Sequence, residues 1–344
     1  VVDRFEITSV ADFDGIERTA FVELILGSGA SFAFGLQSDE GGIIMENSSS
    51  VRGNIYSNGS IVGSGGNLVY GDAVSAGSGG SAATNGYVEK IHATGTIWAN
   101  TIIGSEADGD VQCDTIDASS PPGPTASEVH GDAYCDNILG GTLVHGSTFS
   151  GPASDQPTTS LPIDDNLVRQ WETEASAIGT TTPGTCPWVI NTDTTLNGVI
   201  TCDVEISGND TITLEGPVWI RGNLTITNQP TIQATTTLGI SSVQLIVDNP
   251  NNRSTSSQID IRNSTTFTGA SAGSYVLLLS MNDDAENGGS EPAVIIEQSS
   301  DGDVLVYAGS GEVRIKNSAS MKEVTGYVIR LQNNSEVVYE TGLA

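Results

Sequence analysis

The chain has 344 residues, with 41 Gly and an aromatic share of only 6%. Its 42 Asp and Glu residues outnumber 12 Lys and Arg residues, so the formal net charge is −30. Such a charge repels nucleic acids and anionic membranes, which excludes both as expected partners. Since no run of about 18 apolar residues occurs, the sequence predicts no membrane-spanning helix.

The N-terminal segment, residues 1–35, alternates apolar and polar residues. RFEITSV and AFVELIL predict two strands joined by a turn at Asp14-Gly15. Because the sequence opens on Val1 within a strand-like pattern, we interpret it as a processed or trimmed ectodomain whose targeting segment is missing. Membrane attachment is therefore expected only through an absent N-terminal anchor.

Residues 36–151 contain many short apolar stretches separated by Gly, Asn and Ser. Strands so short cannot cover a sandwich core, but stacked coils of about 20 residues bury alternate side chains against their neighbours. In GNIYSNGSIVGSGGNLVYGDAVSAG, we expect Ile55, Ile61, Val69 and Val74 to be core residues. A flexible Gly-rich linker is the alternative, and regularly placed β-branched residues disfavour it.

Residues 152–182 separate two strand-rich parts. The Pro/Ser/Thr-rich start predicts an extended connector, and IDDNLVRQWETEASAIG predicts one helix, with Asp164 as its N-cap and Gly179 at its end. We expect this helix to cover a flank or seal an open end of the strand array. Its predicted apolar face consists of Leu167, Trp171 and Ile178.

Residues 183–344 resume the strand pattern and are richer in Val and Ile. Asn, Ser and Gly again mark the corners, where stacked Asn side chains can hydrogen-bond from coil to coil. The predicted fold is therefore all-β: a right-handed parallel β-helix (solenoid) in two parts, with a short N-terminal β segment and one flanking α-helix.

The four cysteines fall into two local pairs, Cys113 with Cys135 and Cys186 with Cys202. Two disulfides are the preferred interpretation, and free buried thiols are the alternative. The sequence has no Cys-x-x-Cys pair and no His close to these cysteines, so it does not indicate a zinc site there. A disulfide that closes a loop of about 15 residues contributes on the order of 3 kcal/mol. Disulfides indicate an oxidising compartment, so we expect an extracellular or cell-surface location.

Several stretches, taken in order, resemble blocks of PilX-type and prepilin-like bacterial surface proteins. They are ITSVADFDGIERTAFVELIL, GNIYSNGSIVG, LPIDDNLVRQWETEA, TTLNGVITCDVEISGNDTITLEGPVWIRGNLTI and SASMKEVTGYVIRLQNNSEVVYETGLA. The Gly-apolar repeats are also similar to those of bactofilins. The resemblance implies an exported, pilus- or membrane-anchored structural protein with a β-helical ectodomain and no catalytic residues to transfer.

Two acidic loops are candidate metal sites, because alternating acids supply the hard oxygens that Ca²⁺ prefers. Ordinary solvated loop acids are the alternative for both. The candidate calcium ligands are Glu106, Asp108, Asp110 and Asp114 in SEADGDVQCD, and Asp283 and Asp284 in SMNDDAENGGSEP.

No established catalytic pattern is present, although Asp283 and Asp284 could serve as acid and base if they lined a groove. Trp98, Trp188 and Trp219 would form a sugar-stacking platform if they faced outward, but packing within the coil is the preferred interpretation. We therefore predict a non-enzymatic structural protein that self-associates or joins other pilus or surface subunits, in assembly or adhesion. The alternative is a polysaccharide-binding or polysaccharide-degrading protein, with a glycan or host surface as its partner.

Overall fold

A computed structural model of the chain describes residues 4–13, 16–25, 30–118, 127–151 and 155–340. This described part is all-β apart from the helix α1 (Asp165–Ile178) and the short 3-10 helix η1 (Thr236–Leu238), as the sequence predicts. None of its helices combines the length and the apolar character that crossing a lipid bilayer requires.

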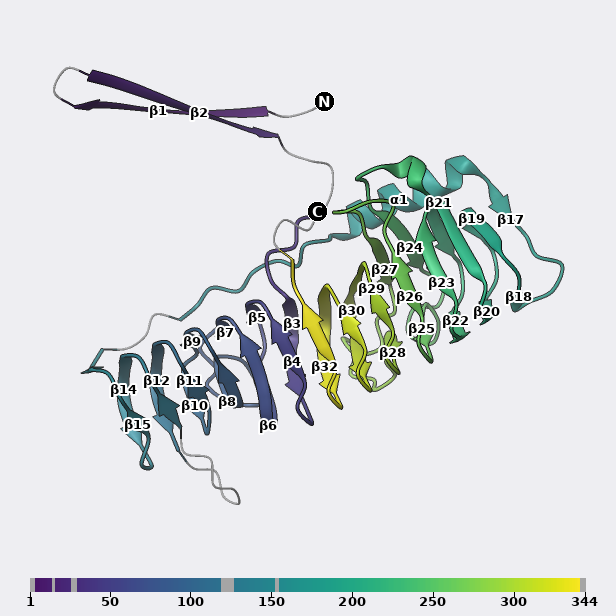
Figure 1. Cartoon of the computed structure of the whole chain (residues 1–344). Coiled ribbons are helices and arrows are strands. Elements are labelled where there is room, and N and C mark those ends of the chain that lie inside the picture. The colour runs from purple at the N-terminus through teal and green to yellow at the C-terminus, as the bar shows by residue number, and fades with distance from the viewer. Residues whose placement is uncertain (1–3, 14–15, 26–29, 119–126, 152–154, 341–344) are drawn as a thin grey trace.

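The N-terminal strands form a separate antiparallel sheet. Strand β1 (Arg4–Phe13) pairs along its whole length with β2 (Ile16–Ile25), so that Arg4 lies opposite Ile25. Figure 1 draws this hairpin apart from the main array of strands. The two predicted strands are confirmed, while the predicted turn at residues 14–15 lies outside the described residues.

All other strands belong to one sheet, and all their pairings are parallel. The first series is β3 (Leu36–Met45), β4 (Ser50–Arg52), β5 (Ile55–Ser57), β6 (Ile61–Tyr70), β7 (Ala73–Ser75), β8 (Tyr87–Ala93), β9 (Ile97–Trp98), β10 (Thr101–Ile103), β11 (Glu106–Ala107), β12 (Val111–Asp117), β13 (Glu128–Val129), β14 (Ala133–Leu139), β15 (Leu143–Val144) and β16 (Thr148–Phe149). The second series is β17 (Thr180–Thr181), β18 (Trp188–Ile190), β19 (Thr194–Ile200), β20 (Val204–Gly208), β21 (Thr211–Ile220), β22 (Leu224–Asn228), β23 (Thr231–Ala234), β24 (Val243–Val247), β25 (Ile259–Ile261), β26 (Thr266–Thr268), β27 (Val276–Ser280), β28 (Val294–Ile296), β29 (Asp301–Gly302), β30 (Val304–Lys316), β31 (Ser320–Met321), β32 (Glu323–Gln332) and β33 (Glu336–Val338).

The two series join in the middle of the array. Strand β3 pairs with β32, the penultimate strand of the chain, and β4 pairs with β33 (Figure 1). From this joint the first series runs outward to β16. The chain then returns through residues 155–164 to the other end, where β17 starts the second series that runs back to β32 (Figure 1).

Long bent strands close the sheet on itself. Residues 36–38 of β3 pair with β5, whereas residues 43–45 pair with β6, on the far side of a bend. At the corners that follow β3, β30 and β32, Asn residues adopt positive φ angles, and they stack: Asn47 Nδ2 donates to Asn333 Oδ1 at 2.8 Å, and Asn333 Nδ2 donates to Asn317 Oδ1 at 2.9 Å. The predicted Asn corners with coil-to-coil hydrogen bonds are therefore confirmed.

The core consists of side chains that occupy matching positions on successive strands. One interior column contains Leu36, Ile55, Ala73, Ile97, Val111 and Ala133, each at most 1% exposed. Ile55, Ile61 and Val69 are core residues as predicted. The prediction for Val74 is wrong, because in β7 the neighbouring Ala73 points inward and alternation turns Val74 outward.

A second apolar layer covers one outer face of the array. Strands β24, β27 and β30 bear apolar residues on both faces, and α1 packs on this side through Val168, Trp171 and Ala175. The helix has its predicted cap, since Asp164 Oδ1 accepts a hydrogen bond from the Leu167 backbone N–H at 2.8 Å. The predicted apolar face is correct at Trp171 and at Leu167, which is partly buried against the same layer, and wrong at Ile178, which is 48% exposed.

The connector that precedes the helix is bound along the same side. Asn58 exchanges two hydrogen bonds with Thr159, at 2.8 and 2.9 Å. Further along, the Gln156 carbonyl accepts from the Gly77 N–H at 2.9 Å, and the Ile163 carbonyl accepts from the Tyr307 hydroxyl at 2.6 Å. The connector is therefore hydrogen-bonded to both strand series.

Candidate functional site

A five-residue corner repeat builds the most distinctive surface of the first series. It reads LVYGD at 68–72, HATGT at 92–96, EADGD at 106–110, EVHGD at 128–132 and LVHGS at 143–147. The second residue is apolar and points into the core, and the fourth is always Gly. The first and third residues flank the buried one, so alternation directs both to the outer surface.

The glycines of this repeat stack directly on one another. The N–H of Gly131 donates to the Gly109 carbonyl at 3.1 Å, and the N–H of Gly146 donates to the Gly131 carbonyl at 3.1 Å. A Cβ atom on Gly131 would lie 2.6 Å from the backbone of Gly109, which no side chain tolerates. The repeat therefore requires Gly at this position, and the close stacking brings neighbouring corners into side-chain contact.

All three histidines of the chain lie on these stacked corners. Register places Glu106 beside His92 on one side and Glu128 on the other, so the three form one row. The third residues of the repeats form a second row, which holds the remaining side chains that could bind a metal ion. The histidine ladder, as we call both rows together, consists of His92, Glu106, Asp108, Glu128, His130 and His145.

Short distances link the ladder into one cluster. His92 Nε2 lies 3.1 Å from Asp108 Oδ1, and His145 Nε2 lies 2.9 Å from Glu128 Oε1. His130 Nε2 lies 3.3 Å from Glu106 Oε1 and 3.8 Å from Glu128 Oε1, and so bridges the two halves. The rings of His130 and His145 are stacked, with centroids 4.9 Å apart and planes 4° apart.

The ladder divides into two groups of potential metal ligands. One contains His92, Glu106 and Asp108, and the other contains Glu128, His130 and His145; within each group the ligand atoms all lie within 4.8 Å of one another. The six side chains are between 34% and 46% exposed, so an ion would reach them from solvent. Of the predicted calcium ligands, Glu106 and Asp108 belong to this ladder.

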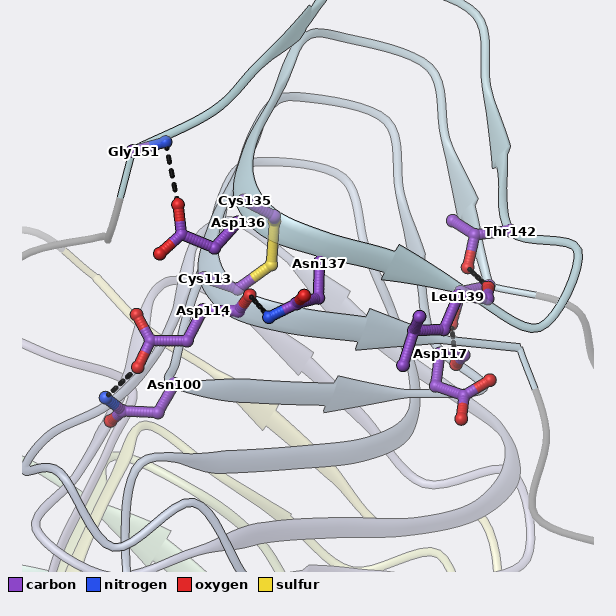
Figure 2. Close-up of a disulfide and its surroundings, with 11 residues drawn as sticks. Asn100, Cys113, Asp114, Asp117, Cys135, Asp136, Asn137, Leu139, Thr142 and Gly151 are labelled. Atoms are coloured by element: carbon purple, nitrogen blue, oxygen red, sulfur yellow. Dashed lines mark hydrogen bonds between the residues drawn. A yellow bond between two sulfur atoms is a disulfide. The ribbon is translucent and has the colours of Figure 1, made fainter.

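The other two predicted ligands of that loop lie elsewhere. Asp110 Oδ1 accepts a hydrogen bond from the Asp132 backbone N–H at 2.8 Å and so bridges consecutive corners. Asp114 lies on the opposite side of the corner, where its Oδ2 accepts from Asn100 Nδ2 at 3.2 Å (Figure 2). Asp110 directly precedes β12, whereas Asp114 is the fourth residue of this strand, which carries it away from the corner.

The disulfide Cys113–Cys135 lies beside Asp114 (Figure 2). Its cysteines face each other in register on β12 and β14, with Cα atoms 4.7 Å apart, and are almost completely buried. The second disulfide joins Cys186 to Cys202. Both predicted pairings are confirmed, and they are consistent with a non-reducing compartment.

The second predicted acidic loop borders a cleft of about 450 Å³ between the N-terminus of α1, strand β30 and the residues that follow β27. Asp283 lines this cleft, and its Oδ1 accepts from Ser254 Oγ at 2.7 Å. Asp284 instead accepts the Glu291 backbone N–H at 2.9 Å within its own loop. The carboxylates that line the cleft are Asp39, Asp164, Asp165, Asp283 and Glu286.

A buried acidic pair lies under the helix near this cleft. Asp248 is fully buried and accepts two hydrogen bonds from Arg253, at 2.8 and 2.9 Å. Burial, together with the neighbouring Asp248 carboxylate, raises the pKa of Glu172 to about 8. Neither carboxyl group is accessible, since Glu172 is only 8% exposed, so we assign this pair a structural role.

Trp98, Trp188 and Trp219 are all half-buried. Trp219 is part of the layer beneath α1, where its Nε1 donates to the Asp248 carbonyl at 2.9 Å. Trp98 borders a small crevice with Asp155 and Gln156 of the connector. Trp188 packs against the edge of the core. Packing, the preferred interpretation, holds for Trp188 against the core and for Trp219 in the layer beneath α1, while Trp98 lies beside the connector.

Both ends of the array have open strand edges among the described residues. At one end β15 and β16 pair only with β13 and β14, and at the other β17 and β18 pair only with β19 and β20. Near β16 the rings of Tyr134 and Phe149 stack with centroids 4.8 Å apart. The large apolar side chains exposed at this end are Tyr134, Leu139, Leu143 and Phe149.

Neither a family model nor a curated protein nor a solved structure matches the chain. The resemblance to prepilin-like surface proteins stays a prediction. Function is therefore inferred from the open ends, the ladder and the disulfides.

Proposed function

We propose that the chain is a right-handed parallel β-helix that serves as an extracellular structural subunit and assembles end to end with further copies. The solenoid is supported by the parallel pairing of successive strands and by the interior columns of apolar side chains. The same resemblance to pilus and bactofilin-type proteins that the sequence carries favours a non-enzymatic role in assembly or adhesion.

The observation that carries the proposal is the pair of open ends. The row of strands that ends at β16 is the same row that begins at β17, because register connects them pair by pair through β3 and β32. Since every pairing is parallel, the β17 edge of a second copy can continue the β16 edge without reversing strand direction. Repeated head-to-tail contacts of this kind produce a filament.

The outer side chains at the β16 end support a second copy as the occupant. The outer row that holds Trp98 continues through Gln112 and Tyr134 to Phe149. The connector lies beside this row at Trp98, whereas Tyr134 and Phe149 are 36% and 45% exposed. A further coil on β16 would bury the exposed rings, as strand stacking does elsewhere in the array.

Light scattering and electron microscopy of the purified chain test this proposal. We expect head-to-tail filaments whose length rises with protein concentration, and we expect Phe149→Lys to stop their growth by placing a charge in the joint. The matched control is Ile240→Lys, since Ile240 is 81% exposed and lies away from both ends. A monomer at all concentrations, or filaments of F149K like those of wild type, would contradict end-to-end assembly.

Glycan binding is a second candidate function, favoured by the acidic cleft beside α1. Five carboxylates and Arg253 line it, and such a polar hollow suits the hydroxyl groups of a sugar. Titration calorimetry with soluble oligosaccharides should then give heats that Glu286→Gln reduces. An absence of heat with neutral and with cationic sugars argues against this role.

A further inference from the structure

We infer that the histidine ladder is a binding site for divalent transition-metal ions of the Zn²⁺ class. The tighter site is formed by Glu128, His130 and His145, and an adjacent site is formed by His92, Glu106 and Asp108. The tighter site reaches the β16 end of the array, because His145 lies between the terminal strands β15 and β16. The assignment rests on the ligand set and its distances and does not require end-to-end assembly.

The ligand types favour a transition metal over calcium. Ca²⁺ takes six to eight hard oxygens, and each group of the ladder offers only one or two carboxylates. Neutral imidazole nitrogen is instead a preferred ligand of Zn²⁺, Cu²⁺ and Ni²⁺. Two imidazoles and one carboxylate, as at Glu128, His130 and His145, form a three-ligand zinc set that leaves a fourth position open for water.

The geometry needs only small side-chain movements. Zn²⁺ binds nitrogen and oxygen at about 2.0–2.2 Å, so its tetrahedral ligands lie roughly 3.2–3.6 Å apart. His145 Nε2 is already 2.9 Å from Glu128 Oε1, and His130 Nε2 is 3.8 Å from the same oxygen. Both imidazoles are exposed enough to rotate, while the backbone beneath them is held by the stacked glycines.

Charge favours a bound cation as well. The ladder contains three carboxylates and three imidazoles, so with neutral histidines it has a formal charge of −3. The nearby Asp110 and Asp132 add to the negative field, and among the described residues the ion pairs of the ladder join only His with Asp or Glu.

Calorimetry with ZnCl₂ on the full, metal-free chain, at a salt concentration that screens nonspecific binding, tests the assignment. We expect two equivalents of Zn²⁺, with little competition from excess Ca²⁺. The variant His145→Ala should weaken the tighter site by about 10- to 100-fold, and His92→Ala should remove the second equivalent. Glu291→Gln is the matched control, since this exposed acid lies far from the ladder.

Nuclear magnetic resonance gives a readout that loss of folding would not imitate. With only three histidines, each imidazole can be followed through its ring ¹⁵N shifts. We expect Zn²⁺ to shift His130 and His145 first and His92 later, and His145→Gln to retain the fold but lose the first shift. Three outcomes would each overturn the inference: no Zn²⁺ binding, unchanged binding in a His130→Ala/His145→Ala double variant, or Ca²⁺ binding as tight as that of Zn²⁺.

Discussion

At the scale of single residues, buried acids are the least expected feature of this Gly- and Ser-rich chain. Glu172 is part of the helix face that packs on the sheet, close to the fully buried Asp248. Arg253 donates two hydrogen bonds to Asp248, and burial together with the Asp248 carboxylate favours the protonated form of Glu172. Glu323 is similar, because complete burial raises its pKa well above the usual value.

We predict that Glu172→Gln makes the protein more stable at alkaline pH. The folded pKa of about 8 exceeds the unfolded value of 4.5, so folding retains a proton that the unfolded chain releases between these values. The free energy of unfolding therefore falls as pH rises through this window, and the glutamine variant lacks this part of the loss. Urea unfolding of both proteins at acid and at alkaline pH should show a difference of about 2–4 kcal/mol.

Glu323 contributes a pH dependence of the same sign, so the test is the difference between wild type and variant rather than either slope alone. Parallel slopes for E172Q and wild type would mean that Glu172 is ionised in the folded protein. A Glu174→Gln variant is the matched control, because Glu174 is exposed on the same helix.

At the scale of elements, the stacked corners are more constrained than their composition suggests. A flexible linker would use Gly for freedom, whereas here Gly95, Gly109, Gly131 and Gly146 leave room for the backbone of the neighbouring corner. The fifth residue of the repeat adds a second link, as Asp132 Oδ1 accepts from the Ser147 N–H at 2.7 Å. The corners therefore position the histidine ladder through the backbone.

We predict that Gly131→Ala destabilises the protein by about 1–3 kcal/mol, because its Cβ would clash with the backbone of Gly109 and the carboxylate of Asp110. Gly184→Ala is the matched control, since a Cβ there meets no atom within 4 Å. Thermal and urea unfolding measure both. Equal stability of the two variants would contradict this prediction, because it would mean that the stacked corners move apart to accommodate the added methyl group at little cost in free energy.

At the scale of the whole molecule, the two strand series are parts of one sheet. Without the other series, β3 and β32 would each have an unpaired strand edge. The joint between β3 and β32 aligns Ile43 with Ile329, and both side chains are fully buried. The connector adds contacts on the outside, for example between Gln37 and Ser160 at 2.9 Å. The sheet is continuous, although the chain forms one half of it before the connector and the other half after it.

We therefore predict that a chain cut between residues 151 and 155 remains assembled as two fragments. Co-expressed fragments should co-purify, because separating them would expose the apolar edge of β3 and the outer face beneath the connector. The variant Ile43→Asp should release one fragment from the other by burying a charge in the joint. Independent elution of unsubstituted fragments would contradict the continuous core.

Local sequence determined much of the secondary structure: the apolar alternation of the strands, the Asn and Gly corners, the capped helix at Asp165–Ile178 and the local cysteine pairs. These features depend on propensities and short-range spacing, which a single sequence displays. Two predicted apolar contacts failed, at Val74 in β7 and at Ile178 on the helix, since only packing decides which apolar residues of an element are buried.

Tertiary structure alone decided where distant residues meet. The spacing between equivalent corners varies from 14 residues, between His92 and Glu106, to 24, between Leu68 and His92, so no fixed period in the sequence predicts that the histidines meet. The five-residue repeat with its Gly was the available signal. No local sequence pattern indicates the pairing of β3 with β32, because parallel pairing between strands nearly 300 residues apart depends on the position of all the strands between them.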